Sequence, residues 1–151
     1  DGERVFLQRD DDASVETAEE SFNVKQRIFE IPLDAPEEMS IISDPDREVD
    51  VFSFTVTPSE EEIIFQSISN PDDGGIYEYE LYKYNLHTKE EKQLTFFGEY
   101  VGDLVISEGG EIVYFMLDKK FGKGDPEYHL YQMKLNGDQV LEIPLPLMLT
   151  E

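Results

Sequence analysis

The sequence contains no cysteine and no tryptophan, and its basic residues are scarce. The lack of cysteine excludes disulfide bonds, thiol catalysis and thiolate metal sites. Only 12 lysines and arginines stand against 35 acidic residues, which gives a formal charge of −23. We therefore predict no nucleic-acid binding, because phosphate contacts need a basic face. No apolar run approaches the roughly 20 residues that cross a bilayer, so we also predict no membrane insertion of this segment.

What is present suits one folded domain. The chain has 151 residues, of which 39% are hydrophobic, including 10 phenylalanines and 8 tyrosines, and this is enough for a core. The acidic residues are spread along the whole chain, and we interpret them as a solvated surface. The first residue is Asp1, without a methionine or an apolar leader. We expect a portion of a longer protein, extracytoplasmic in the cell envelope or secreted, such as a lipoprotein whose signal or anchor is removed.

Two runs of sequence recur three times when the chain is aligned with itself. The first run is GERVFLQRD at 2–10, EEIIFQSIS at 61–69 and GEIVYFMLD at 110–118. The second run is RIFEIPLDA from Arg27, ELYKYNLHT from Glu80 and HLYQMKLNG from His129, with separations of 53 and 49 residues. Repetition at such a period indicates a repeat architecture. We divide this single domain into repeats of approximately 1–45, 46–98 and 99–146.

Apolar residues occupy every second position of the second run, which predicts β-strands with one buried face. They are Phe29, Ile31 and Leu33, then Tyr82, Tyr84 and Leu86, then Tyr131, Met133 and Leu135. Polar turns follow, then closing strands around 39–43, 92–97 and 140–145. Leading strands at 49–58 and around 104–106 precede the second and third copies. The sequence thus predicts an all-β fold of three tandem, antiparallel, four-stranded units, of which the first lacks its leading strand. Residues 147–149 are candidates to supply that strand or to begin a further unit.

The order of these runs resembles the repeat of the TolB-like β-propeller family. The best match is TPSEEEIIF at 57–65, followed by the run at 81–86 and by QLT at 93–95. In that family the first turn usually reads Ser-Pro-Asp-Gly, often after a tryptophan; here the turn is degenerate and the tryptophan is missing. The resemblance implies propeller-type blades and a partner-binding scaffold that is frequently extracytoplasmic, and it identifies no ligand.

Three units are fewer than the 4 to 8 blades of ordinary propellers. We therefore expect either a partial or half propeller, or a homodimer that closes a six-bladed ring by covering the exposed sheet edges.

Long loops occur at the same place in each copy, at 10–26, 66–79 and 116–128. Insertions that recur on one face of a repeat protein commonly form its binding surface. Four aromatic residues provide anchors of the kind enriched in interfaces: Tyr77, Tyr79, Phe121 and Tyr128. We predict that they bind a protein partner or an envelope ligand. The alternative is that these rings pack on the sheets.

Five aspartates in short turns are candidate calcium ligands: Asp44, Asp46, Asp72, Asp73 and Asp125. The EF-hand pattern is absent, and Asp beside Gly or Pro is typical of plain turns. We interpret them as turns, keep calcium as the alternative and predict no other cofactor.

We predict no enzyme activity, because no nucleophile motif, phosphate loop or zinc motif is present. His87 and His129 are interpreted as structural. Asp50 and Asp103 could face a shared channel, as in glycoside hydrolysis. The alternatives are therefore the propeller part of a carbohydrate-active or peptidase-type hydrolase, with catalysis by acids or by a further domain, and a structural spacer of a surface protein.

Overall fold

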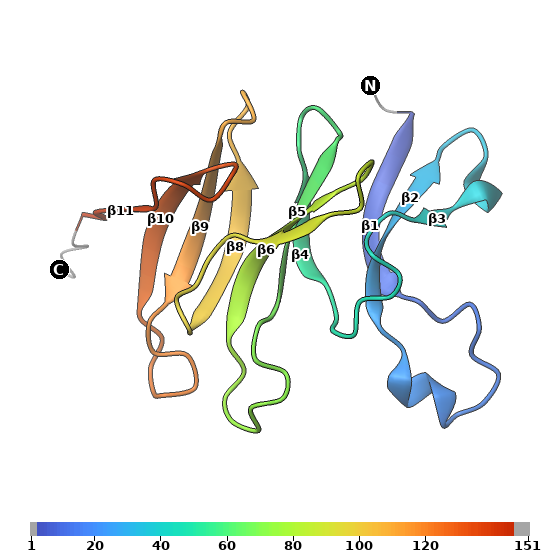
Figure 1. The fold of residues 1–151 in the computed structure, drawn as a ribbon, viewed down its shortest axis with the longest axis horizontal. Coiled ribbons are helices and arrows are strands. Elements are labelled where there is room, and N and C mark those ends of the chain that lie inside the picture. The colour runs from blue at the N-terminus through green and yellow to red at the C-terminus, as the bar shows by residue number, and fades with distance from the viewer. Residues whose placement is uncertain (1–2, 147–151) are drawn as a thin grey trace, which may run out of the picture.

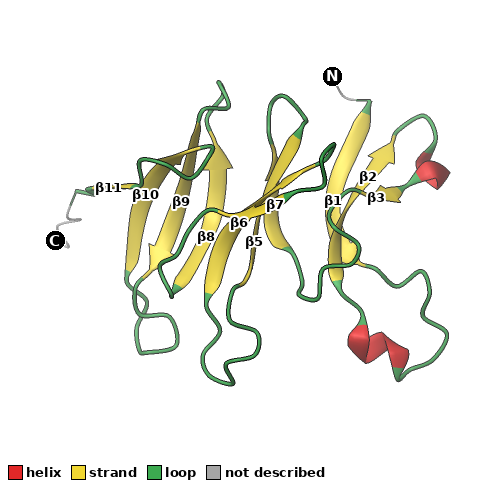
Figure 2. Ribbon diagram, in the orientation of Figure 1, coloured by secondary structure: helices red, strands yellow, loops and turns green. Residues whose placement is uncertain are grey.

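The computed structural model describes residues 3–146, which form strands and two short 3-10 helices (Figure 2). The strands of the first repeat are β1 (Arg4–Asp10), β2 (Gln26–Pro32) and β3 (Ser40–Ile41), and its helices are η1 (Glu20–Asn23) and η2 (Pro36–Glu38). The other strands are β4 (Phe52–Val56), β5 (Glu62–Ile68), β6 (Tyr79–Asn85), β7 (Glu91–Gln93), β8 (Tyr100–Ile106), β9 (Ile112–Asp118), β10 (Tyr128–Lys134) and β11 (Leu141–Ile143). The prediction of an all-β fold is confirmed.

The strands form one small and one large sheet. The small sheet has the order β1-β2-β3, and the large one has the order β11-β10-β9-β8-β6-β5-β4, with β7 also on β6. A single parallel pair, Tyr79 with Tyr100, joins the two halves of the large sheet. On either side of that pair, β4 to β7 and β8 to β11 are antiparallel meanders. Figure 1 shows the three groups side by side, from the blue N-terminal group to the red C-terminal one.

The three groups repeat the same strand register. The central pairs are Leu7 with Phe29, Phe65 with Tyr82, and Phe115 with Tyr131. The leading strands β4 and β8 also share an irregularity, at Phe52/Phe54 and at Gly102/Val105. Within each irregularity one residue has a positive φ, 26° at Ser53 and 50° at Asp103. The internal repeat of the sequence is therefore also a repeat of the backbone.

The hairpin turn after each leading strand is also repeated. The N–H of Glu62 donates to the Thr57 hydroxyl at 3.2 Å, and the N–H of Ile112 donates to the Ser107 hydroxyl at 3.1 Å. Each turn then needs one residue of positive φ, supplied by Glu60 (57°) and by Gly110 (71°). A hydroxyl at the start and a left-handed residue three positions later therefore suffice for this turn, although its sequence varies.

The prediction that the strands have one buried face is wrong for the middle of the molecule. Adjacent Ile63, Ile64 and Phe65 on β5 are all buried, as are Leu81 and Tyr82 on β6. The reason is that the first and third groups of strands pack against opposite sides of this group. Each group of strands has two faces. We call the side that carries Phe29, Tyr82 or Tyr131 the front face of its group, and the side that carries Ile28, Leu81 or Leu130 the back face.

The closing strands are shorter than predicted, with two residues in β3 and three in β7 and β11. They lie at sheet edges, and their exposed residues include Glu91, Lys92 and Glu142. Short, charged edge strands are the usual protection against pairing with another sheet. The apolar run at 147–149 lies outside the described residues.

Candidate binding surface

Three long loops lie at the same end of the sheets, the lower end in Figure 1. They follow the second strand position of each repeat, so the strand order brings them together although they are far apart in the sequence. We call them loop 1 (residues 11–25), loop 2 (69–78) and loop 3 (119–127). Each loop has its own internal hydrogen bonds, described next.

Loop 2 is closed by one asparagine. The Asn70 side chain accepts the N–H of Glu78 at 2.7 Å and donates to the carbonyl of Ile76 at 3.1 Å. The N–H of Ser69 donates to the Glu78 carbonyl at 2.9 Å. Gly74 has a φ of +65°, a conformation that glycine adopts without steric cost. The loop therefore has a defined shape across its base.

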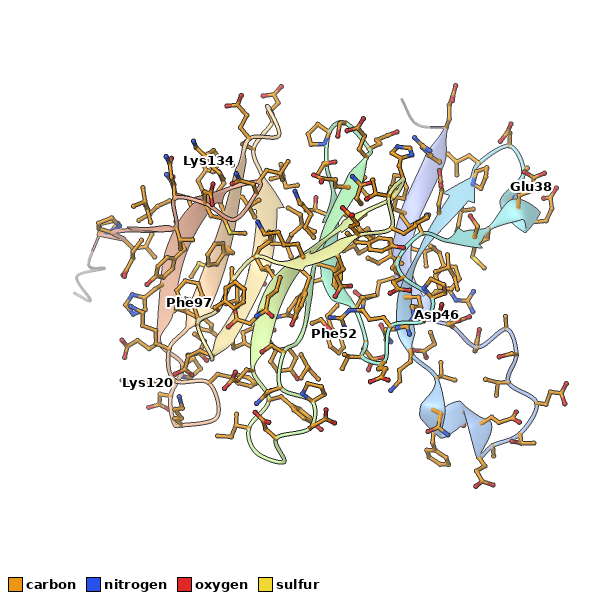
Figure 3. All side chains as sticks on the ribbon, viewed as in Figure 1. Glu38, Asp46, Phe52, Phe97, Lys120 and Lys134 are labelled. Carbon is orange, nitrogen blue, oxygen red and sulfur yellow. The ribbon has the colours of Figure 1, made fainter. Side chains whose placement is uncertain are left out.

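Loop 3 is closed by an aspartate in a similar way. The buried Asp118 carboxylate accepts the N–H of Lys120 and the N–H of Glu127, both at 2.9 Å. An ion pair between Lys120 and Glu127, at 2.6 Å, spans the same base from outside. Figure 3 shows Lys120 at this end of the molecule, with Lys134 at the opposite end.

Loop 1 contains the helix η1. The Glu20 carboxylate accepts the N–H of Glu16 at 2.8 Å and of Thr17 at 3.1 Å, and these bonds lower the pKa of Glu20. Phe22 in the helix is 87% exposed. The internal bonds of all three loops reduce the entropy that a bound partner would have to remove.

An aromatic cluster joins loop 3 to the strand ends. The Tyr79 ring lies 5.0 Å from Tyr100, 5.6 Å and edge-on from Phe121, and 6.1 Å from Phe52 between centroids. Tyr100 and Phe121 lie 4.7 Å apart. Burial raises the pKa of the Tyr79 hydroxyl, with Tyr100 adding to the effect. Tilted and edge-on rings at these distances attract one another, so Phe121 fixes loop 3 on β6 and β8.

Loops 2 and 3 meet beside this cluster. A Cβ atom at Gly122 would lie 3.0 Å from the Ile76 side chain, so the two loops are in close contact there. Lys123 of loop 3 forms an ion pair with Glu99 at 2.5 Å. Ile76 and Tyr77 remain about half exposed, at 51% and 47%. We call Ile76, Tyr77, Phe121 and Gly122 the loop junction.

The structure divides the four predicted binding residues into two groups. Tyr79 and Phe121 contact each other, and their rings pack on the sheet. This is the alternative that we gave for these residues. Tyr77 and Tyr128 are exposed. Tyr128 begins β10 opposite Asp118 and has no ring contact with the cluster among the described residues.

Sequence reasoning missed Tyr100 and Ile76. Tyr100 corresponds to Asp50 in the second repeat, so comparison of the repeats carried no signal for it. Ile76 could have been found, because it is the one aliphatic side chain in an otherwise polar loop beside Tyr77.

One position at the start of β2, β6 and β10 carries a charged or titratable side chain in every repeat: Arg27, Glu80 and His129. The Arg27 guanidinium donates to the carbonyls of Val49 (3.2 Å) and Arg47, and burial lowers its pKa. The Glu80 carboxylate accepts the Thr95 hydroxyl and the N–H of Gly98 (2.7 Å). Burial raises the pKa of Glu80, although these bonds oppose the effect. Arg27 thus binds residues 47–49 and Glu80 binds residues 95–98, and each of these segments leads to the next group of strands.

His129 lies between two glutamates. Its ring nitrogens are 2.6 Å from Glu142 and 3.1 Å from Glu127. The bond to Glu142, followed by that to Glu127, raises the pKa of His129. The bonds from His129, then Tyr131 and Lys119, lower the pKa of Glu142 to about 2. Tyr131 and Lys119 also bond to Glu142, at 3.0 and 3.3 Å. This group is an ion-pair network on the surface of β10 and β11.

The candidate calcium ligands are separate turns. The Asp44 carboxylate accepts the N–H of Asp46 at 3.0 Å, as in an ordinary Asx turn. Asp72, Asp73 and Asp125 are exposed. From residue 3 to residue 146, no three histidine, aspartate or glutamate side chains gather as a metal site would require. Calcium thus gains no geometric support here.

The two acids considered for hydrolysis also differ in surroundings. Asp50 accepts the N–H of Gln26 at 2.7 Å and holds β2, whereas Asp103 is exposed at the irregularity of β8.

In the part of the chain described, neither helix has the length or apolarity to cross a membrane.

Comparison with known proteins finds similarity among solved structures. No protein-family model matches the chain, and no curated protein matches its sequence. Among solved structures, the tricorn protease is similar with a TM-score of 0.52 and 11% sequence identity. The match covers 72% of this chain but only 12% of the tricorn protease chain. At this identity the likeness concerns the fold alone, and it supports an all-β, propeller-like architecture for this chain.

Proposed function

We propose that this chain is a non-catalytic binding module that recognises a protein partner through the loop junction. The observation that carries the proposal is the pair of exposed apolar side chains, Ile76 and Tyr77, on loops whose bases are hydrogen-bonded. Exposed aromatic and aliphatic groups on an ordered framework are typical of interface anchors. Binding there would order few further groups, which favours affinity.

The finer architecture that we propose is three propeller-type blades of the kind found in TolB-like repeats. The support is the common register of the three groups and the equivalent irregularities of β4 and β8. Each of the two complete groups has four antiparallel strands in sequence order. An extracytoplasmic location remains part of the proposal, and it rests on the composition, above all on the lack of cysteine.

The chemistry of the junction indicates what kind of partner fits. The acidic side chains of loop 2 beside Ile76 and Tyr77 are Asp72, Asp73 and Glu78. The three lysines of loop 3 are each paired with a glutamate: Lys119 with Glu142, Lys120 with Glu127 and Lys123 with Glu99. The whole chain carries a charge of −23. A complementary partner has an apolar pocket with a basic rim, because opposite charges speed the encounter and like charges exclude other proteins.

A second candidate is the propeller part of a larger hydrolase. It is favoured by the similarity to a protein named as a protease, of which the match covers a small part. In that case the catalytic groups would lie in another domain, and the loop junction would contact that domain or its substrate.

Quantitative capture from an envelope extract of the source organism tests the proposal. The immobilised chain is compared with the double variant Ile76→Ser, Tyr77→Ser and with the control His87→Ser, which lies in the turn after β6 at the other end. We expect one saturable partner, with capture reduced at least about tenfold in the double variant, the effect of losing about 1.4 kcal/mol, and unchanged in the control. Equal capture by all three proteins, or turnover of glycoside or peptide substrates by the chain itself, would contradict it.

A further inference from the structure

The two interfaces between neighbouring groups of strands are built from the same pair of faces. Ile28, on the back face of the first sheet, packs with Ile63, Phe65 and Tyr82 on the front face of the second group. Ile64 and Leu81 on the back face of that group pack with Phe115 and Tyr131 on the front face of the third. The rule in this molecule is therefore back face against front face.

The front face of the first sheet is not covered in this way by the described residues. Its Val5 is 43% exposed, whereas the equivalent Ile63 and Val113 are fully buried. Leu7 is half-buried, whereas its equivalents Phe65 and Phe115 are buried. Ile31 is half-buried as well. Phe29 on this face is buried, with the Arg9 guanidinium over its ring. The apolar side chains that remain accessible on it are therefore Val5, Leu7 and Ile31.

The back face of the third group is less buried than the equivalent face of the second group. Tyr114 and Leu130 are half-buried, although their equivalents in the second group, Ile64 and Leu81, are fully buried. Val105, which pairs with Tyr114, and Leu141, which pairs with Gln132, lie on the same face and are 60% and 56% exposed. One back face and one front face are therefore left over, at opposite ends of the described chain.

We propose that a second copy of this chain covers both faces. The back face of the third group in each copy packs on the front face of the first sheet in the other, and Leu130 then meets Leu7. The two buried interfaces support this pairing, since Leu81 and Phe115, which hold the equivalent positions, belong to one core cluster. Two such contacts close a ring of six groups of strands, three from each chain. Six is within the 4 to 8 blades of known propellers. A head-to-tail contact forms rings only if its rotation closes.

Sedimentation velocity from micromolar to millimolar concentration tests the proposal. We expect a closed species of twice the 17.5 kDa of one chain. A single-chain mass throughout the range would overturn the proposal, and so would an open series of larger species, because the ring would then not close. Neither result bears on partner capture by the loop junction, so the two proposals can fail separately.

Two variants test which faces are in contact. Leu130→Lys and Leu7→Lys are each expected to give single chains, because a buried unpaired charge is costly. Their equimolar mixture should form dimers again, since one of the two interfaces then contains neither lysine. The control Phe22→Lys, at a position of loop 1 that is 87% exposed, should stay dimeric. Dimers of Leu7→Lys alone, or no recovery in the mixture, would overturn the face pairing; circular dichroism verifies that each variant is folded.

Discussion

Replacing Thr95 by valine should destabilise the protein through two buried groups at once. The Thr95 hydroxyl accepts the N–H of Leu81 at 2.8 Å and donates to the Glu80 carboxylate. Valine has nearly the same shape but no hydroxyl, so both partners would lose a bond inside the protein. A buried polar group without a partner costs about 1–3 kcal/mol. We therefore expect the free energy of unfolding to fall by about 3 kcal/mol, a large share of the roughly 5–15 kcal/mol of a typical domain.

The first repeat offers a matched control for this experiment. The Ser43 hydroxyl accepts the N–H of Ile28 at 3.0 Å, in the place that Thr95 occupies for Leu81. Ser43→Ala leaves a single N–H without a partner, so its cost should be about half that of Thr95→Val. Urea unfolding followed by circular dichroism measures both values.

The pH dependence separates the two losses in Thr95→Val. Burial raises the pKa of Glu80, and the bond from Thr95 opposes that rise. Without Thr95 the pKa of Glu80 in the folded protein should rise further, so the variant gains more stability on acidification. The cost should therefore be smaller at about pH 5 than at about pH 8, whereas that of Ser43→Ala should stay constant. A cost below about 0.5 kcal/mol, or one independent of pH, would refute the reasoning.

Three further predictions concern single positions. Gln139→Gly should stabilise the fold by about 0.5–1 kcal/mol, because Gln139 has a φ of +54° that glycine adopts freely; Gln139→Ala, which keeps the strain, should give no such gain in urea unfolding. His129→Gln should lower the melting temperature most between about pH 5 and pH 6.5. There the raised pKa of His129 keeps it charged and Glu142, with a pKa of about 2, is ionised; as the pH rises through the histidine pKa the difference should vanish, and a constant difference would contradict the pairing. Phe121→Ala should increase hydrogen exchange in loop 3 but not in loop 1, because only loop 3 depends on the aromatic cluster.

The strands were predictable because their signal is repeated. The run from Glu80 recurs from His129. Each run lies in a seven-residue strand that begins one position before it, at Tyr79 and at Tyr128. The alternation of apolar and polar residues predicted the strands better than it predicted which side chains are buried. Leu81 and Tyr82 are adjacent and both buried, because a sheet lies on each side, and this depends on how the sheets stack rather than on any one strand.

The candidate surface was predictable only in part. The loop positions followed from the repeats. The contacts of Tyr79 were not predictable, because they involve Phe52, Tyr100 and Phe121 from three other segments, and only the fold brings these rings together. The role of Arg27 was hidden as well, since an arginine on an alternating strand gives no sign that carbonyl groups surround it.

Site-specific photo-crosslinking tests the central claim, that the loop junction binds a protein, most directly. A photoreactive phenylalanine analogue replaces Tyr77 in one sample and His87, an exposed residue in the turn that follows β6, in another. After irradiation in the envelope extract, we expect a discrete protein adduct from position 77 and none from position 87. No adduct at position 77, or the same adduct from both positions, would contradict the account.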